Sequence, residues 1–428
     1  MNRNNQGFKP LLLLIAVNVL GMILIMIKGE EAFGDMIQLC LVMCVLSVAA
    51  YALIYFCKMG DLYLFVIISM LSSVGIIMQS RIESANGIRQ MKLYLLGVGF
   101  FFVTMLFYRL LHKHLRRLTV AYFSLSMLLF TLTAIFGTVR NGSKNWIVVG
   151  GASIQPSEFI RIFFVLSLAA VLTNANVGLR KDKPKGKIPL SPDEKNLKRM
   201  RLMLAAGISY INAFCLLLQR EWGIALLFFA IYLAFLYIYG ESKLFFGANV
   251  LMVLASGTFG VKFMSHIKVR VATWLDPFAD VTGKGYQIAQ SLFAIGEGGF
   301  AGRGIGNGSP YFIPVVSSDF IFSAICEEMG VLGGTAIIML FFVLVYRGFK
   351  IALSSTNEFN KAVSVGLSVM LGVQTFIIVG GVIKLIPLTG ITLPFISYGG
   401  SSMISTFIVL GILQAISGMK GEVTDEIE

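Results

Sequence analysis

Three carboxylates lie at the start of, and within, one apolar stretch of the chain that runs from Ser317 to Val345. Asp319 opens the stretch, and Glu327 and Glu328 follow eight and nine residues later. In a continuous helix the glutamates would lie roughly 12 Å below its start, where an ionised side chain costs about 2.5–3.5 kcal/mol. We expect both to be structural, facing the bundle interior and accepting hydrogen bonds from neighbouring helices. Asp319 is expected at the water–lipid boundary, where partial desolvation raises the pKa of a carboxylate and suits it to act as a base.

A second set of polar residues precedes and opens the apolar segment that begins at residue 157. Glu158 and Arg161 are three residues apart, so a helix places them on one face, just inside the membrane. The helix dipole favours an acid in the first turn, but it does not explain the acid and the cation together. Paired charges at that depth usually line a cavity. The candidate binding residues of this stretch are Lys144, Trp146, Gln155, Ser157, Glu158 and Arg161.

Two further stretches bring cations, hydroxyls and glycines to the same predicted membrane face. In KLIPLTGITLPFISYGGSSM, two prolines and three glycines indicate broken helix ends that line a pocket. Its candidate binding residues are Lys384, Ser397, Gly399, Gly400 and Ser401. The other stretch, GEGGFAGRGIGNG, has seven glycines in thirteen residues. It could bring backbone N–H groups to a phosphate, or simply form a tightly turned surface loop. It lacks the strand–helix context of a P-loop or a Rossmann motif.

The composition places these residues in a polytopic membrane protein. Apolar residues make up 57% and charged residues 13% of the 428 positions, and the mean hydropathy is +0.82. No soluble domain of this length needs so apolar a composition. We predict an all-α fold of about twelve transmembrane helices with one long extracytoplasmic loop, residues 265–318. The predicted spans are 11–28, 36–57, 62–79, 93–112, 118–138, 157–173, 202–218, 222–239, 245–264, 319–346, 362–386 and 397–417.

The distribution of basic residues predicts the orientation. The segments YRLLHKHLRR and GLRKDKPKGKIPLSPDEKNLKRMR carry four and nine Lys or Arg residues. Both lie in the cytoplasm when twelve spans are threaded from a cytoplasmic N-terminus, as the positive-inside rule requires, and the C-terminus is then cytoplasmic as well. The net charge of +13 is therefore explained by membrane topology and does not indicate nucleic-acid binding. The five cysteines lie in apolar spans and no metal-ligand cluster is visible, so we predict no structural metal site.

Four long motifs follow one another along residues 139–417. They are GSKNW with IQPSEFIR; QREWGIAL; WLDPF with GYQIAQSLFAIGEGGFAGRGIG and DFIFSAICEEMG; and IPLTGITLPFISYGGSS. In content and order they resemble the SEDS (shape, elongation, division and sporulation) family, to which RodA and FtsW belong. In QREWG, Glu221 stands where the family has an aspartate.

The chain also departs from the family pattern. The family commonly has three spans before the Gln-Pro-Ser-Glu helix, whereas five are predicted here. Residues 1–60 are therefore expected to be an added N-terminal helix pair, residues 61–417 the SEDS-like catalytic domain with its ten-helix core, and residues 418–428 a cytoplasmic tail. The glutamate and histidine common before the loop aspartate are absent, although Asp319 is kept. Arg161 replaces a common lysine, and Ile378 a common asparagine.

The resemblance implies a peptidoglycan glycosyltransferase in the bacterial cell membrane. The implied substrate is lipid II, a disaccharide-pentapeptide on undecaprenyl diphosphate, and the implied acceptor is a sugar 4-hydroxyl. Asp319 would be the catalytic base; the alternative is a helix N-terminal acid that is stabilised by the dipole. The cations Lys144, Arg161, Arg270 and Lys384 would meet the diphosphate, with Glu158 orienting Arg161, and Gln287 is a further candidate binding residue.

The resemblance also implies a class B penicillin-binding transpeptidase as the partner. No cofactor is evident, although a divalent cation, Mg²⁺ or Mn²⁺, is compatible with a diphosphate substrate. Two other classes of function stay open: a lipid II flippase or other transporter, which would also carry intramembrane charges and broken helices, and a non-catalytic scaffold of a cell-wall synthesis complex. The polar residues cluster at one membrane face, whereas a transport path should place them across the full depth. The motifs do not distinguish roles in elongation, division and sporulation.

Overall fold

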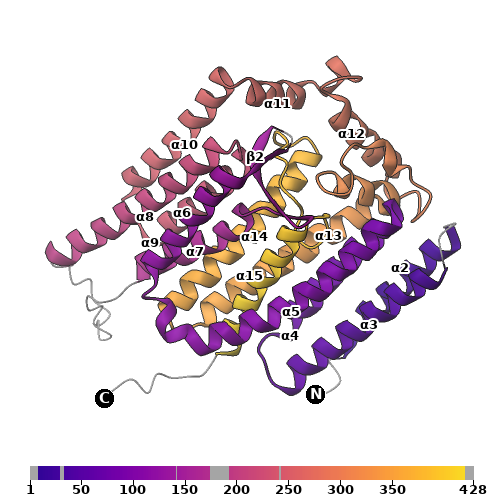
Figure 1. The fold of residues 1–428 in the computed structure, drawn as a ribbon, viewed down its shortest axis with the longest axis horizontal. Helices are drawn as coiled ribbons and strands as arrows, with labels where there is room; N and C mark the ends of the chain where they lie inside the picture. The colour runs from indigo at the N-terminus through magenta and orange to yellow at the C-terminus, as the bar shows by residue number, and fades with distance from the viewer. Residues whose placement is uncertain (1–7, 29–32, 141, 174–191, 241, 420–428) are drawn as a thin grey trace.

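The computed structural model describes residues 8–28, 33–140, 142–173, 192–240 and 242–419 (Figure 1). Every predicted span corresponds to a helix, so the predicted all-α polytopic fold is confirmed. Its elements are α2 (Lys9–Lys28), α3 (Phe33–Phe56), α4 (Leu62–Ile82), α5 (Ser84–Leu115), α6 (Thr119–Phe136), β1 (Thr138–Arg140), β2 (Ser143–Val149), β3 (Ala152–Ile154), α7 (Ser157–Thr173), α8 (Pro192–Leu218), α9 (Trp222–Tyr239), α10 (Lys243–Phe263), α11 (Ser265–Leu275), η1 (Pro277–Asp280), α12 (Tyr286–Gly298), η2 (Pro310–Phe312), α13 (Ile321–Ser354), α14 (Glu358–Val382) and α15 (Gly400–Gly418).

The helices divide into a packed centre and a lipid-facing periphery. Eleven of the described helices are long and apolar enough to cross a membrane, and the remaining predicted span, α7, is a buried helix of 17 residues. α4, α7, α14 and α15 are buried along most of their length. α10, in contrast, buries only Asn249 and Gly260. Helices suit the bilayer because they satisfy their own backbone hydrogen bonds, so the exposed apolar side chains of the peripheral helices can face lipid.

Small residues allow a close crossing of α5 and α15. A side chain at Gly97 of α5 would collide with the ring of Phe407, and one at Gly411 of α15 would collide with the backbone oxygen of Phe101. Close approach at small residues is a general device for packing helices in membranes, where the hydrophobic effect offers no drive. This crossing holds the start of α15, and therefore the segment before it, in place.

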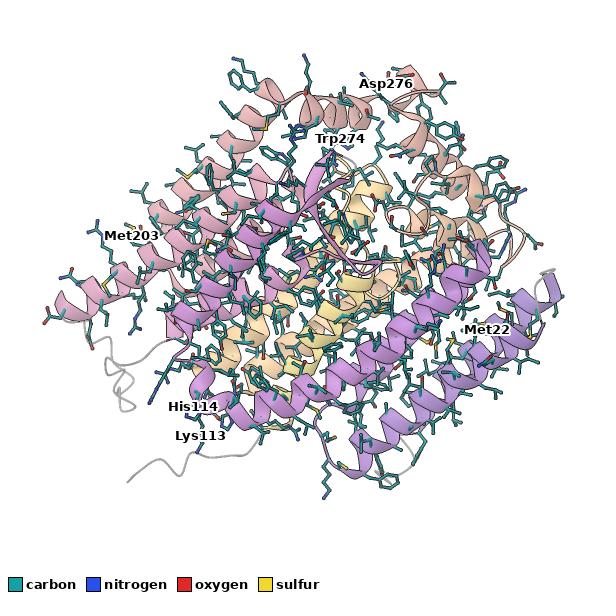
Figure 2. The ribbon with its side chains drawn as sticks, in the orientation of Figure 1. Met22, Lys113, His114, Met203, Trp274 and Asp276 are labelled. Carbon is teal, nitrogen blue, oxygen red and sulfur yellow. The ribbon has the colours of Figure 1, made fainter. Side chains whose placement is uncertain are left out.

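The bundle has two distinct ends. At one end lie the β-strands, α11, α12 and the segment 383–399, and we call this the loop face (Figure 1). At the other end, the opposite face, the N–H of Asp61 donates to Ser417 Oγ at 2.9 Å, and Arg347 bonds the Asp61 carboxylate at 2.7 Å. Figure 2 shows Trp274 and Asp276 at the loop face and Lys113 and His114 at the opposite face. The first residues of α2 and the last of α15 both lie toward the opposite face.

A small sheet covers the loop face where the sequence suggested only a loop. β1 pairs with β2 and β2 with β3, all antiparallel, in the order β1-β2-β3. β2 reads SKNWIVV, whose β-branched and aromatic residues favour a strand, and Gly150 and Gly151 take positive φ in the turn to β3. The sheet delivers the chain directly into α7.

α13 is not one continuous helix. Gly330 has φ 69°, so the helix breaks there. Before the break, the backbone oxygen of Ser317 accepts from Gln79 at 2.7 Å, and Glu328 accepts from Arg81 at 3.0 Å. Gln79 and Arg81 differ by only about 3 Å along α4, so residues 317–329 run along the loop face and do not descend from it. The expectation that the glutamates lie roughly 12 Å below Asp319 is therefore wrong, because the chain turns into the bundle only at Gly330.

Candidate active site

Asp319 lies at the loop face beside Arg270 of α11. A Cβ built on Gly390 would be 3.6 Å from Asp319 Oδ2 and 3.9 Å from Arg270 Nη2, so both side chains face the same glycine. Arg270 Nη1 also donates to the backbone oxygen of Thr389 at 2.9 Å. Burial raises the pKa of Asp319, while the hydroxyl of Ser318 and the charge of Arg270 oppose the rise. Desolvation thus shifts the pKa of Asp319 in the direction expected from the sequence, and its role as a base stays a prediction.

The alternative role for Asp319, a helix cap, finds no support in the hydrogen bonds. The N-cap of α13 is Phe320, not Asp319, and it makes no side-chain cap hydrogen bond. The start of α13 is instead held from two sides. Ser397 Oγ donates to the backbone oxygen of Ser318 at 2.5 Å, and Ser323 Oγ lies 2.6 Å from Ser291 Oγ of α12. The neighbours of Asp319 therefore hold its position, and its carboxylate is not used to cap the helix.

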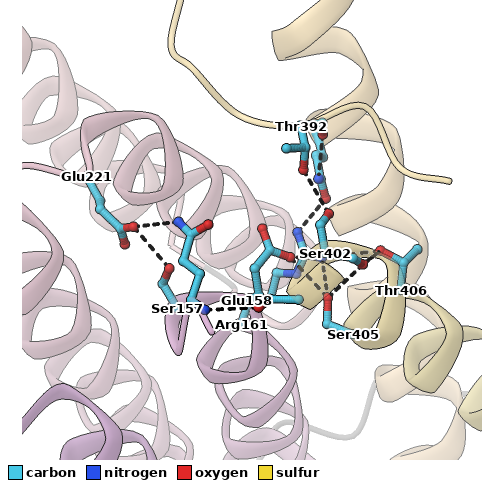
Figure 3. Close-up of polar contacts among 11 residues, drawn as sticks. Ser157, Glu158, Arg161, Glu221, Thr392, Ser402, Ser405 and Thr406 are labelled. Carbon is cyan, nitrogen blue, oxygen red and sulfur yellow. Dashed lines mark hydrogen bonds and ion pairs between the residues drawn. The ribbon is translucent and has the colours of Figure 1, made fainter. Parts of the chain in front are cut away.

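Glu158 and Arg161 form a fully buried ion pair, 2% and 1% exposed, between α7 and α15 (Figure 3). Ser405 Oγ donates to Glu158 at 3.0 Å and accepts from Arg161 at 2.8 Å. Arg161 also donates to Gln374 Oε1 at 2.7 Å, and Gln374 Nε2 donates to the backbone oxygen of Thr392 at 2.9 Å. The network therefore joins three helices to the segment 383–399. The Nη1 and Nη2 atoms of Arg161 thus donate to groups of the protein, and diphosphate binding by Arg161 stays a prediction.

Glu221 is the residue whose importance sequence reasoning missed. It lies between α8 and α9, and its Oε1 accepts from Gln155 at 2.7 Å and Ser157 at 3.1 Å (Figure 3). The same oxygen accepts from Asn145 at 2.5 Å. Its Oε2 is buried without a partner. Burial raises the pKa of Glu221 to about 6, although the three hydrogen bonds oppose the rise. The signal was present in the sequence, because Glu221 occupies the acid position of QREWG.

We expect Glu221→Gln to remove a pH dependence of stability. A carboxyl group whose pKa is raised by folding stabilises the protein fully below its ordinary value of 4.5, and this contribution is lost as the pH rises through about 6. The displacement corresponds to about 2 kcal/mol. Between pH 4.5 and pH 7, the melting temperature of the wild-type protein in detergent should therefore fall relative to that of Glu221→Gln. Parallel melting curves over this range would contradict the assignment.

The glycine-rich stretch wraps around the two glutamates of α13. Ser309 N–H donates to Glu327 at 2.6 Å and Gly306 N–H donates to Glu328 at 3.2 Å. The prediction that the glutamates accept structural hydrogen bonds is thus met, although a loop supplies most of the donors and Arg81 of α4 supplies the other. The backbone N–H groups of Gly306 and Ser309 are therefore engaged by carboxylates of the same chain and are not open to a phosphate.

The remaining candidates spread around this face. Exposed side chains are those of Lys144 on β2, Arg270 on α11 and Gln287 on α12, whereas Trp146 and Lys384 are half-buried. Lys144 Nζ donates to the backbone oxygen of Ala134 at 2.6 Å. Gln155 N–H donates to Ser401 Oγ at 2.9 Å, which joins the Glu221 cluster to the start of α15 at Gly399 and Gly400. In the described part of the chain, no group of three His, Cys, Asp or Glu residues is placed to hold a metal ion.

Comparison with known proteins decides the family. A family model described as "Cell cycle protein", that of FtsW, RodA and SpoVE, matches residues 50–421. The chain belongs to this family. The resemblance drawn from the motifs is therefore confirmed, and most of α2 and α3 lies outside the matched range. Whether residues 1–60 form an added unit stays a prediction.

Members of the family from other bacteria are similar over most of their length. The peptidoglycan glycosyltransferase RodA of Mycobacterium tuberculosis is 36% identical, covering 85% of this chain and 79% of that protein. Stage V sporulation protein E of Bacillus subtilis is 33% identical, covering 83% of this chain and 96% of that protein. A solved structure described as a peptidoglycan synthase complex that coordinates polymerization and crosslinking has a TM-score of 0.66 at 24% identity, and the match covers 85% of this chain and 99% of that one. The structure of Thermus thermophilus RodA has a TM-score of 0.55 at 22% identity, and the match covers 85% of this chain and 98% of that one. These structures support the fold.

Proposed function

We propose that this protein is a peptidoglycan polymerase that joins lipid II units into glycan strands, with Asp319 as the catalytic base. Its relative RodA of Mycobacterium tuberculosis carries the name peptidoglycan glycosyltransferase, which is the activity predicted from the motifs. The observation that carries the role of Asp319 is its place beside Arg270 at the loop face, half-buried and with a raised pKa. A base and a cation side by side suit the transfer of a sugar away from a diphosphate.

The proposed step is a glycosyl transfer from the lipid diphosphate to a sugar hydroxyl. The 4-hydroxyl oxygen of the acceptor sugar bonds to the anomeric carbon of the donor, while the bond from that carbon to the diphosphate oxygen breaks. The diphosphate leaves with the bonding electrons, and Asp319 takes the hydroxyl proton. Arg270, Lys384 and Lys144 are three cations of this face that are not fully buried, and we assign them to the leaving diphosphate. Arg161 and Glu221 position α7, α15 and the segment 383–399 around the reacting groups.

Arg270 gives this proposal a pH signature. Its charge lowers the pKa of Asp319, so Arg270→Gln should raise that pKa further. A base works only when deprotonated, and its rate falls as the pH drops through its pKa. The ordinary pKa of an aspartate is about 4, so the acid limb of the pH–rate profile should lie above pH 4. In Arg270→Gln it should move to a still higher pH. An acid limb that stays in place while the rate falls would show that Arg270 does not act on Asp319.

The loop face is proposed to be extracytoplasmic and both termini cytoplasmic. Much of the basic loop that supports this orientation lies outside the described residues, but Lys113 is exposed at the opposite face and Lys284 at the loop face. In a Cys57→Ser background, which removes the exposed native thiol, Lys284→Cys should react with an impermeant maleimide on intact cells. Lys113→Cys should react only after permeabilisation. Reversed labelling would overturn the orientation and the location of the active site.

We also propose a partner for this protein and consider its need for a metal ion. A solved structure with this fold belongs to a complex that couples polymerization to crosslinking, which supports a transpeptidase partner, here a class B penicillin-binding protein. We assign no step to a metal ion. The sequence indicates no cofactor and leaves room for Mg²⁺ or Mn²⁺; addition of a chelator to the assay would test whether either ion is needed.

The test of the function must separate a polymerase from a flippase and from a scaffold. In detergent solution there is no second leaflet, so transport cannot occur, and a scaffold changes no substrate. The purified protein, with its partner where needed, should consume lipid II and release one undecaprenyl diphosphate for each disaccharide transferred. Unchanged lipid II under conditions in which the protein is folded and binds it would reject the polymerase.

A further inference from the structure

A cavity of about 500 Å³ lies between α8 and α10, away from the site around Asp319. Its lining combines three cations of α8, Lys195, Lys198 and Arg199, with apolar side chains that include Leu202 and Phe245. α8 reaches the loop face at its C-terminal end, next to Glu221, and its 27 residues span about 40 Å. Its first turns, and the cavity with them, therefore lie at the opposite face. Met203, which also lines the cavity, is visible on the outer side of the bundle in Figure 2.

Hydrogen bonds fix the inner end of this cavity. Tyr210 of α8 donates to Asn249 Oδ1 of α10 at 2.6 Å, and Tyr232 of α9 donates to the same atom at 3.1 Å. Asn249 is 5% exposed and follows directly after Ala248, which lines the cavity. Three helices are thus tied together below the apolar part of the cavity. These bonds therefore hold α8, α9 and α10 together at the inner end of the cavity.

The order of charge and apolar surface along α8 identifies the kind of occupant. Lys195 and Arg199 are one helical turn apart on one side of α8, and Leu202 and Met203 follow on the membrane side. The acids that open the same helix, Asp193 and Glu194, do not line the cavity. A cationic rim above an apolar interior complements a phosphate headgroup with attached acyl chains. Basic pockets between transmembrane helices bind anionic lipid headgroups in this way.

We propose that the cavity between α8 and α10 binds an anionic glycerophospholipid of the leaflet opposite the active site. The phosphate contacts Lys195 and Arg199, and an acyl chain lies against Leu202, Phe245 and Ala248. Bound lipid fills the space between α8 and the start of α10. α10 leads through α11 to Arg270, so the lipid supports the element that carries a proposed site residue.

The experiment measures phosphatidylglycerol binding to the full-length protein by native mass spectrometry in detergent. Each basic residue near a membrane surface is worth about fivefold in affinity, so Lys195→Gln/Arg199→Gln should weaken binding roughly thirtyfold. The matched control is Lys113→Gln/Arg117→Gln, two cations of the opposite face outside the cavity, which should change the affinity by less than about twofold. Equal losses in the two double variants would show general charge attraction and overturn the proposal.

A second variant tests the apolar part of the cavity while leaving the cations unchanged. Ala248 is exposed to the cavity, so Ala248→Trp should fit without disturbing the core and should displace the acyl chain. Loss of phosphatidylglycerol binding in this variant, with the melting temperature unchanged, supports a lipid. Unaltered binding in Ala248→Trp, or displacement of phosphatidylglycerol by inorganic phosphate at the same concentration, would overturn it in favour of a simple anion site.

Discussion

Asp319→Asn is expected to lower the rate of glycan-strand formation by roughly 10²–10⁴ while the protein stays folded. The amide keeps the size of the carboxylate and can still bond Ser318, but it cannot accept a proton at neutral pH. Asp319 caps no helix, so its replacement should leave the melting temperature nearly unchanged. The rate is measured with purified lipid II, and the fold by thermal melting of the same preparation.

Asp276→Asn is the matched control for this substitution. Asp276 is also an acid of the loop face, and it accepts hydrogen bonds from Phe278 and Ala279 as the cap of η1. An asparagine caps equally well, so this variant should polymerise at close to the wild-type rate. A comparable loss in both variants would indicate that an acid anywhere on this face affects the rate, and would remove the special role of Asp319.

Arg161→Ala is expected to produce the largest loss of stability, about 3–5 kcal/mol. The substitution leaves the Glu158 carboxylate charged, 2% exposed and without its partner, and it also leaves Gln374 without a donor. An uncompensated buried charge costs far more than the hydrogen bonds alone. Thermal melting in detergent should show a large decrease for Arg161→Ala. A wild-type melting temperature would mean that the buried network is not formed in the protein.

The double variant Glu158→Leu/Arg161→Met separates structure from substrate binding. Replacing both charges with apolar residues of similar size is often neutral, so this protein should melt closer to the wild type than Arg161→Ala does. If the folded double variant binds lipid II normally, Arg161 is not a ligand of the diphosphate. If it melts normally but no longer binds lipid II, the sequence-based assignment of Arg161 to the diphosphate is supported.

The sequence predicted the membrane helices well because the bilayer imposes length and hydropathy locally. It also placed Asp319, Arg161 and the segment 383–399 at one face, since span counting fixes which ends meet. It did not predict the break at Gly330, because a glycine within an apolar run is compatible with a continuous helix. The depth assigned to Glu327 and Glu328 depended on that continuity.

Long-range contacts account for the other differences. Glu221 was read as part of a family motif, but its importance comes from three donors that lie more than sixty residues earlier in the chain. Arg161 was expected to be available to the diphosphate because a sequence shows its charge but not its hydrogen-bond partners Ser405 and Gln374. The glycine-rich loop was recognised, but not the carboxylates that its N–H groups bind.

The role of Asp319 is tested most directly by gel-resolved glycan synthesis from lipid II with the purified full-length protein. Wild type and Asp319→Asn are run side by side, with the partner transpeptidase present. We expect a ladder of glycan strands for the wild type and almost none for the folded Asp319→Asn protein. Strands formed at a near-wild-type rate by Asp319→Asn would contradict its role as the base. The absence of strands from an active, folded wild-type preparation would contradict the proposed function itself.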